Sequence, residues 1–281
     1  MKAFISDIHG NAEALCVVLE DIRASGIEHI ICLGDIVGYG ADPELCVDMV
    51  MDKTDLRIMG NHDHALIYEP VGFNPLATEV IKLTKEKMNP SDTHGHAMPQ
   101  DDEDYLICPC AGGVPRCLIM EHSKASRWKY LRNMPLQKEE GGVLYIHGSP
   151  LDPTFEYVIP DIIPGSWNPG HIQEMFAKIK WLAFCGHTHR PCIITSDLAC
   201  IYPEECNYEY ALDRAKKYIV NIGSVGQPRD QDPRSCHVRY DEAADMIYWK
   251  RIGYDIDKTV GKITQMCGAE SWCGLRLYQG R

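Results

Sequence analysis

No apolar run in this sequence reaches the roughly 18 residues that a membrane-spanning helix requires. The first apolar stretch is interrupted at Asp7, too early for the core of a signal peptide. Positive charge is also scarce, because 28 Lys and Arg face 40 Asp and Glu and the formal net charge is −12. Surfaces that track nucleic acid or anionic membranes need clustered basic residues. We therefore expect a cytoplasmic protein that binds neither nucleic acid in bulk nor a membrane.

The sequence contains no Cys-x-x-Cys pair, although it has 13 cysteines. Such pairs are typical of structural zinc sites and of redox motifs. The number of cysteines is odd, and Cys32 and Cys185 lie in apolar runs of the kind that form buried strands. We therefore expect buried, reduced thiols rather than a disulfide framework.

Short apolar runs alternate with helical patterns over the first two thirds of the 281 residues, which is typical of a layered α/β fold. The expected strands are residues 2–6, 29–33, 56–59, 143–146 and 181–185, and the expected helices are residues 12–24, 43–51, 76–87 and 171–179.

From Pro191 onward the pattern changes to strands and turns. These later strands are expected at residues 192–195, 218–222, 236–240 and 246–251. We expect them to form a second, largely antiparallel sheet that packs on the first.

Two stretches interrupt the pattern. Residues 88–116 are rich in Pro, Gly, Asp and His and predict a long loop insertion, and residues 196–215 predict a shorter excursion between two late strands. Neither resembles a linker between independent domains, so we expect one domain over residues 1–281.

Five of the expected strands are followed at once by Asp, Asn or His in a turn that contains Gly. These turns read Asp7-Ile8-His9-Gly10-Asn11, Gly34-Asp35, Gly60-Asn61-His62-Asp63, His147-Gly148-Ser149-Pro150 and Gly186-His187-Thr188-His189. The carboxyl ends of parallel strands converge on one crevice in an open α/β sheet. The sequence therefore predicts one shared polar site.

The donors at this site are four imidazoles, two carboxylates and one amide oxygen. They belong to Asp7, His9, Asp35, Asn61, His147, His187 and His189. Mixed N and O donors suit borderline divalent metals such as Mn, Fe, Ni or Zn. Seven ligands are too many for one catalytic ion with an open position, but they match two ions bridged by a carboxylate, for which Asp35 is the natural choice. Two cations about 3.5–4 Å apart lower the pKa of a shared water and clamp a phosphoryl group.

The order Asp-x-His, Gly-Asp, Gly-Asn-His-Asp, a later His and Gly-His-Thr-His, from Asp7 to His189, resembles the calcineurin-like metallophosphoesterase superfamily. The run Asn-Ile-Gly-Ser-Val-Gly-Gln-Pro-Arg-Asp from Asn221 to Asp230 is similar to the Gly-Ser turn of its small bacterial and archaeal phosphodiesterase branch. The resemblance implies a four-layer αββα sandwich, in which two mixed β-sheets are flanked by helices.

The resemblance also implies a role for each site residue. Asp7, His9, Asp35 and His189 would hold the first metal, and Asp35, Asn61, His147 and His187 would hold the second. His62 matches the catalytic His of the family, which protonates the leaving alkoxide. The implied activity is hydrolysis of a P–O bond in a small-molecule phosphoester by a hydroxide that bridges the two metals.

The segment after the second strand departs from the protein phosphatases of this superfamily, which carry Gly-Asp-x-x-Asp-Arg-Gly there. Gly38 and Tyr39 replace the Asp that orients the catalytic His and the Arg that grips the phosphate, and Met59 replaces a second Arg. A site with less positive charge favours a monoanionic diester over a phosphomonoester dianion. We therefore expect a phosphodiesterase. The same departure leaves open which group orients His62, with Asp63 as a candidate.

Some positions have two interpretations. His122 also follows an apolar run and competes with His147 as a ligand; we prefer His147, because the Gly after it allows close approach to a metal. Arg229 either pairs with Asp230 or Asp232 on the surface or reaches a substrate phosphate.

The turns after the first two strands also have a purely structural interpretation. Asp7 and His9 are compatible with an N-cap region before the helix at residues 12–24. Tyr39 either lines the pocket or serves a turn between Gly38 and Gly40.

Two other functions are compatible with the sequence. The enzyme could act on phosphomonoesters, nucleotides or dinucleoside polyphosphates. Alternatively, the chain is a non-catalytic metal-binding scaffold, like the retromer scaffold subunit of the superfamily, which has lost the catalytic His. Because His62 is present and all seven ligand positions are filled, we expect an enzyme.

Overall fold

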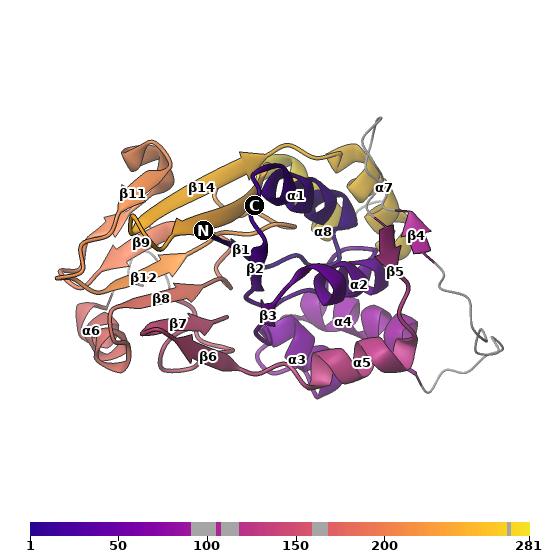
Figure 1. Cartoon of the computed structure of the whole chain (residues 1–281). Helices are drawn as coiled ribbons and strands as arrows, with labels where there is room; N and C mark the ends of the chain where they lie inside the picture. Colours follow the sequence, from indigo (N-terminus) through magenta and orange to yellow (C-terminus); the bar gives the residue numbers. More distant parts are fainter. Residues whose placement is uncertain (91–104, 108–117, 159–167, 269–270) are drawn as a thin grey trace.

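Two six-stranded mixed sheets pack face to face, and helices cover their outer faces (Figure 1). The computed structural model describes residues 1–90, 105–107, 118–158, 168–268 and 271–281. The expected four-layer αββα sandwich is therefore confirmed.

The first sheet has its three parallel strands at one side. Its strands are, in spatial order, β11 (Glu209–Ala211), β14 (Met246–Ile252), β13 (Ser235–Asp241), β1 (Lys2–Ile5), β2 (His29–Cys32) and β3 (Leu56–Arg57). β1, β2 and β3 are parallel to one another, and β13 is antiparallel to β1.

The second sheet has its parallel strands at the centre. Its order is β10 (Cys200–Ile201), β9 (Cys192–Thr195), β12 (Tyr218–Asn221), β8 (Leu182–Cys185), β7 (Val143–Ile146) and β6 (Gln137–Glu140). β7, β8 and β12 run parallel, with Phe184 beside Tyr145 and Val220. A short antiparallel pair, β4 (Tyr105–Ile107) and β5 (Leu118–Met120), stands apart.

The expectation that the strands after Pro191 form a sheet of their own is wrong. β11, β13 and β14 extend the first sheet, whereas β9, β10 and β12 join β7 and β8. The strands that precede the donors are likewise divided, three in the first sheet and two in the second. Strands with both faces covered show the same apolar pattern in either sheet, so the pattern cannot assign them.

The helices in the described residues confirm four of the expected segments and add others. They are α1 (Ala12–Ala24), α2 (Pro43–Lys53), α3 (Asn61–Ile67), α4 (Pro75–Met88), α5 (Lys124–Arg132), α6 (Pro169–Lys178), α7 (Ile256–Cys267) and α8 (Trp272–Leu275), with 3-10 helices η1 (Pro203–Cys206) and η2 (Arg276–Gln279). α1 has the expected bounds. Its N-cap is Asn11, whose side chain accepts a hydrogen bond from the N–H of Ala14 at 3.1 Å. Asp7 and His9 are therefore not caps.

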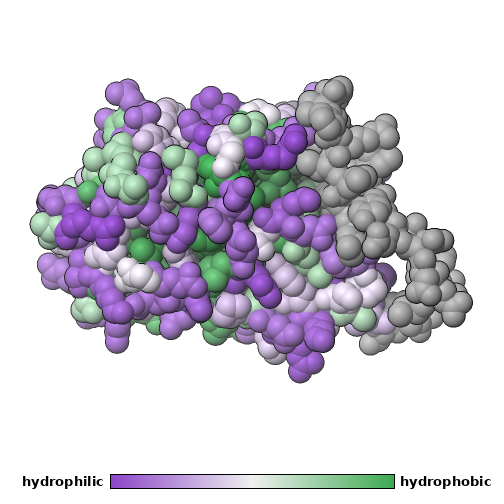
Figure 2. Space-filling view, viewed as in Figure 1, coloured by the Kyte–Doolittle hydropathy of each residue, from purple (hydrophilic) through white to green (hydrophobic). Residues whose placement is uncertain are grey.

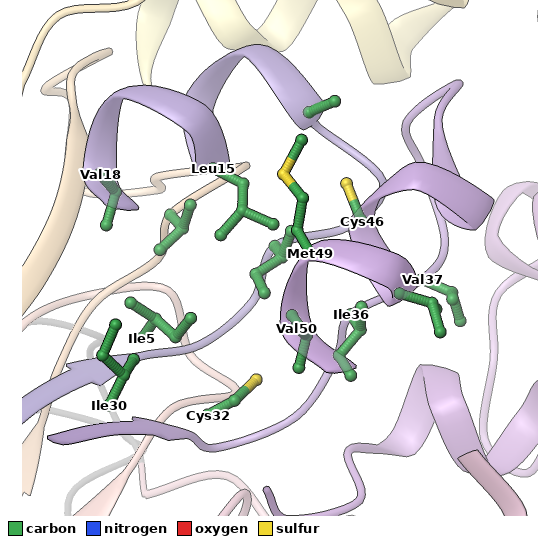
Figure 3. Packing of buried hydrophobic residues seen from close by; sticks show 14 of the residues in the cluster. Ile5, Leu15, Val18, Ile30, Cys32, Ile36, Val37, Cys46, Met49 and Val50 are labelled. Carbon is green, nitrogen blue, oxygen red and sulfur yellow. The ribbon is translucent and has the colours of Figure 1, made fainter. Parts of the chain in front are cut away.

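Apolar side chains fill the space between the two sheets and cover their outer faces. Between the sheets, Phe4 stacks on Phe184 with ring centroids 4.0 Å apart. On the outer face of the first sheet, Ile5 of β1 and Cys32 lie beneath Leu15 of α1 and residues of α2 (Figure 3). α6 covers the outer face of the second sheet. This packing fixes the two sheets relative to one another. It therefore also fixes the positions of the strand ends that carry the donors.

The predicted insertion at 88–116 lies largely outside the described residues. The excursion at 196–215 contains β10, η1 and β11, and β11 pairs with β14 of the other sheet. Cys32 and Cys185 are buried free thiols, as predicted, whereas Cys16 is disulfide-bonded.

The surface shown in Figure 2 mixes hydrophilic and hydrophobic residues, and the hydrophobic ones form small groups. Among the helices that the structure describes, none combines the length and the apolar character needed to cross a membrane.

Candidate metal centre

The loops that follow five strands meet between the two sheets and bring the seven predicted donors together. Asp7 follows β1, Asp35 follows β2, and Asn61 opens α3 just after β3. His147 follows β7, and His187 and His189 follow β8. All of these side chains are buried. The site therefore lies where two sheets meet, not along the edge of one sheet.

Main-chain hydrogen bonds hold these loops against one another. The N–H of Asp7 donates to the carbonyl of Gly34 at 3.0 Å, and the N–H of His9 donates to that of Asp35 at 2.9 Å. Across the sheets, the N–H of His187 donates to Oδ2 of Asp7 at 3.1 Å. The positions of the donors are thus fixed by the backbone of both sheets.

One group of donor atoms consists of Oδ1 of Asp7, Nε2 of His9, Nε2 of His189 and Oδ2 of Asp35. The two Nε2 atoms are 3.1 Å apart, and Nε2 of His189 is 3.2 Å from Asp7 Oδ1. Nε2 of His9 is 3.7 Å from Asp35 Oδ2. Such distances fit donors that surround one small cation.

A second group shares the same oxygen of Asp35. Nε2 of His147 lies 3.4 Å from Asp35 Oδ2, 3.1 Å from Asn61 Oδ1 and 3.2 Å from Nδ1 of His187. Asp35 is therefore the carboxylate between the two groups, the position predicted for a bridging ligand.

Each of the four imidazoles directs its other ring nitrogen to a backbone carbonyl. The pairs are His9 Nδ1 to Val37 O (3.1 Å), His147 Nδ1 to Leu33 O (2.8 Å), His187 Nε2 to Phe155 O (3.1 Å) and His189 Nδ1 to Gln227 O (2.6 Å). A carbonyl only accepts, so each of these nitrogens carries a hydrogen. When the rings are neutral, the nitrogens that face one another inside the site hold lone pairs and cannot hydrogen bond to each other. A cation between them satisfies both, so the donor set fits metal ions.

The backbone at the donors is strained. Asp7, His9, Asp35, His187 and His189 all have positive φ, between 50° and 67°. Residues with a side chain rarely adopt this conformation, and it persists only where the surrounding structure enforces it. Such strain is common at functional sites, and here the surrounding structure holds the donor residues in this conformation.

Burial affects the protonation of the imidazoles. It lowers the pKa of His187 to about 3, assisted by the charge of His147, so the ring is neutral at pH 7. Burial also opposes protonation of His147, but the adjacent Asp35 carboxylate outweighs it and raises the pKa of His147 to about 9. A metal ligand must be neutral, so a cation bound here displaces the proton of His147.

His62, the predicted catalytic residue, lies beside the donors in the first turn of α3. Its ring contacts those of His9, Tyr39 and Phe73, with centroids 4.7, 4.7 and 4.6 Å away. Nδ1 of His62 is buried and has no hydrogen-bond partner among the described residues. Within the described part of the chain, aromatic packing rather than a carboxylate hydrogen-bonded to Nδ1 therefore orients the ring.

Asp63 is thus not the group that orients His62. Its Oδ1 accepts from the N–H groups of Ile36 and Val37 at 2.9 and 3.3 Å, and its Oδ2 accepts from the N–H of Gly60 at 3.1 Å. The carboxylate caps α3 and ties it to the loop after β2, which carries Asp35.

The structure decides between several of the alternative interpretations. His122 lies on the surface with its Nε2 3.0 Å from Asp52, so His147 is the histidine at the site. Tyr39 lines the site. Arg229 does not pair with a neighbouring acid, because Asp230 and Asp232 bind Arg251 and Arg234 instead.

Phe73 and Arg276 were not identified from the sequence. Phe73 precedes α4 and contacts His62, and the charge of Arg276, at the start of η2, acts on Tyr39 and His189. Neither residue follows a strand or belongs to a motif, so no local pattern marks them.

Comparisons with known proteins agree with this geometry. The model of the calcineurin-like phosphoesterase superfamily domain matches residues 1–243. An uncharacterized protein of Methanocaldococcus jannaschii is 34% identical over an alignment of 286 positions, which covers 100% of this chain and 98% of that protein.

Solved structures share the fold. A metallophosphoesterase from Sphaerobacter thermophilus is 30% identical with a TM-score of 0.74, over 99% of this chain and 98% of its own. A hypothetical protein from Pyrococcus horikoshii, 17% identical over 100% of this chain and 98% of its own, has a TM-score of 0.68 and supports the fold alone. The chain therefore belongs to the calcineurin-like phosphoesterase superfamily and is a metal-dependent hydrolase of phosphoric esters.

Proposed function

We propose that the protein is a binuclear-metal phosphodiesterase. The observation that supports this most strongly is the pair of donor groups that share Oδ2 of Asp35, with imidazole lone pairs that face one another. Asp7, His9, Asp35 and His189 would hold one divalent cation, and Asp35, Asn61, His147 and His187 the other. Manganese, iron, nickel and zinc all suit this mixture of nitrogen and oxygen donors.

When bound, two such cations supply Lewis-acid stabilisation of the phosphoryl charge and make a water molecule more acidic. The chain's own residues hold the donors in place through the second ring nitrogens and the strained backbone. Because that geometry is set before substrate binds, little reorganisation is needed during the reaction.

His62 is the proposed general acid that gives a proton to the leaving oxygen. Burial lowers its pKa to about 4, and the positive charge of Arg229 acts in the same direction. The acid form is therefore scarce in the free protein at pH 7, and a bound anionic phosphoester favours it by adding negative charge beside the ring. Tyr39 and Phe73 hold the ring while the proton is transferred.

The preference for a diester rests on the loop after β2. Gly38 and Tyr39 stand where protein phosphatases carry an acid and a phosphate-gripping Arg. A monoanionic diester requires less positive charge there than a dianionic monoester.

Hydrolysis of bis(p-nitrophenyl) phosphate beside p-nitrophenyl phosphate tests the proposal, with metal-stripped protein that is reloaded separately with manganese, iron, nickel and zinc. We expect turnover only with metal, and faster turnover of the diester. Faster turnover of the monoester would instead favour a phosphomonoesterase or nucleotidase. If two ions bind and neither ester, nor a dinucleoside polyphosphate, is hydrolysed, the chain is a metal-binding scaffold.

A further inference from the structure

Arg229 stands at the edge of the proposed site. Its main-chain N–H donates to the carbonyl of His189 at 3.2 Å, and Nη2 donates to Oε1 of Gln227 at 2.7 Å. Its Cζ lies 5.9 Å from the centre of the Tyr39 ring. The residue is half-buried, and its Nε is buried without a partner in the described structure. Part of the guanidinium is therefore available for a ligand that reaches the site.

Arg276 approaches the same place from the end of the chain. Cys273 and Leu277, on either side of it, pack in one cluster with Tyr39. The N–H of Gln231 donates to the carbonyl of Gly280 at 2.9 Å, which joins this segment to the loop of Arg229. Two segments that are far apart in sequence thus lie beside Tyr39, and each of them carries an arginine.

The positive charges of Arg229 and Arg276 act on each other. Burial lowers the pKa of Arg276 to about 10, and among the charged groups around it Arg229 contributes most to the lowering. Two like charges in partly buried positions destabilise one another unless an anion lies between them.

No carboxylate side chain in the described part of the chain lies within ion-pair distance of Arg229 or Arg276. The nearby acids are engaged elsewhere, since Asp230 binds Arg251 and Asp232 binds Arg234. Arg276 donates through Nε to the main-chain oxygen of Arg281. The charge of Arg229 is thus left for a ligand, whereas Nε of Arg276 is engaged by this main-chain oxygen and only the rest of its guanidinium can contact a ligand.

We propose that Arg229 and Arg276 bind a second, non-reacting phosphate group of the substrate. The inference rests on the proposed function and specifies its substrate class, a phosphodiester that carries a further phosphate. The ring of Tyr39 contacts the rings of His9 and His62. Tyr39 also packs in one cluster with the segment that carries Arg276. The segment that carries Arg276 therefore packs against a residue that lines the proposed site. Guanidinium groups suit phosphate because they offer paired N–H donors.

A pair of chromogenic substrates tests the inference: thymidine 5′-(p-nitrophenyl phosphate) and the same compound with a 3′-phosphate. With manganese-loaded wild-type protein, we expect kcat/KM to be about tenfold higher for the phosphorylated substrate, as one charge-assisted contact provides. This ratio should fall about tenfold in Arg229→Gln and in Arg276→Gln. Arg214→Gln is the matched control, because it removes the same charge from an exposed Arg that pairs with Asp245.

Binding without turnover provides a second measurement. Calorimetric titration of metal-stripped protein with thymidine 3′,5′-bisphosphate should give about tenfold weaker affinity in both variants, and wild-type affinity in Arg214→Gln. Unchanged affinity and an unchanged substrate ratio in Arg229→Gln and Arg276→Gln would overturn the arginine site. Failure of the wild-type protein to hydrolyse either substrate would instead contradict the proposed function.

Discussion

Gly38 leaves the space that the ring of His62 occupies. A Cβ atom on Gly38 would lie 2.4 Å from Nδ1 of His62, much closer than any normal contact. The protein phosphatases that the sequence resembles carry an Asp at this position, where this chain has no side chain. The missing carboxylate is replaced by the rings of Tyr39 and Phe73.

Gly38→Ala should therefore displace His62 and lower kcat by about 100-fold, the scale expected for a reacting group misplaced by about 1 Å. Metal content should stay at the wild-type level, since no donor is changed. Gly141→Ala is the matched control, because Gly141 also has positive φ (59°) but a Cβ there would meet nothing within 4 Å. Activity loss of equal size in both variants would show that backbone strain, not contact with His62, is responsible.

His62→Ala should lower turnover by about 10²–10⁴-fold, the usual contribution of a general acid, while metal content remains near wild type. The loss should depend on the leaving group, because a good leaving group needs no proton. Aryl phosphodiesters with phenols of increasing pKa provide the measurement. The wild-type rate should vary little along the series, whereas the His62→Ala rate should fall steeply. Parallel dependence in the two proteins would rule out His62 as the acid, and His122→Ala controls for loss of an imidazole.

Metal stoichiometry distinguishes a bridging ligand from a terminal one. Asp35→Asn should lose both ions, because Oδ2 of Asp35 belongs to both donor groups. His187→Ala should lose the ion of its own group first and should lose activity with it. Elemental analysis after dialysis against a fixed metal concentration measures both. Two ions retained in Asp35→Asn would contradict the shared carboxylate.

Asp21 on α1 ties that helix to β13 through His237 at 2.8 Å and Arg239 at 2.5 Å. The hydrogen bond from His237, and then Arg239, lowers the pKa of Asp21 to about 2. Because this folded-state pKa is below the unfolded value near 3.8, the stabilisation is present above about pH 4 and disappears as the pH falls through about 2.

Asp21→Asn should therefore lower the free energy of unfolding at pH 7 by about 1 kcal/mol, a value reduced by solvent screening of a partly exposed group. Urea unfolding of both proteins at pH 7, 4 and 2 measures the difference. It should be constant from pH 7 to 4 and shrink towards pH 2. A difference that keeps its size at pH 2 would show that the carboxylate's charge is not its source.

That the seven donors and His62 lie together could be predicted, because each follows a short apolar strand and the carboxyl ends of parallel strands converge. The bounds of α1 were predictable because Asn11 caps it and its apolar residues have helical spacing. The local sequence pattern does not predict which distant strands pair. β13 pairs with β1, more than 200 residues earlier in the chain, and β12 pairs with β8. The sequence of a strand that is buried on both faces does not indicate which sheet the strand joins.

Contacts between distant segments account for what was missed at the site. The segment of Arg276 lies beside Tyr39 because α8 and η2 pack in one cluster with it. Asp63 binds the backbone of Ile36, Val37 and Gly60. Aromatic packing around His62 likewise joins three separate segments, through His9, Tyr39 and Phe73. Such contacts depend on tertiary structure, which no spacing of residue types specifies.

The most direct test of the binuclear site is a titration of metal-stripped protein with manganese, in which hydrolysis of bis(p-nitrophenyl) phosphate is measured at each metal equivalent. The two donor groups that share Asp35 predict no turnover without metal and a rate that reaches its plateau at two equivalents. Turnover by stripped protein, a plateau at one equivalent, or two tightly bound ions without turnover would contradict the account.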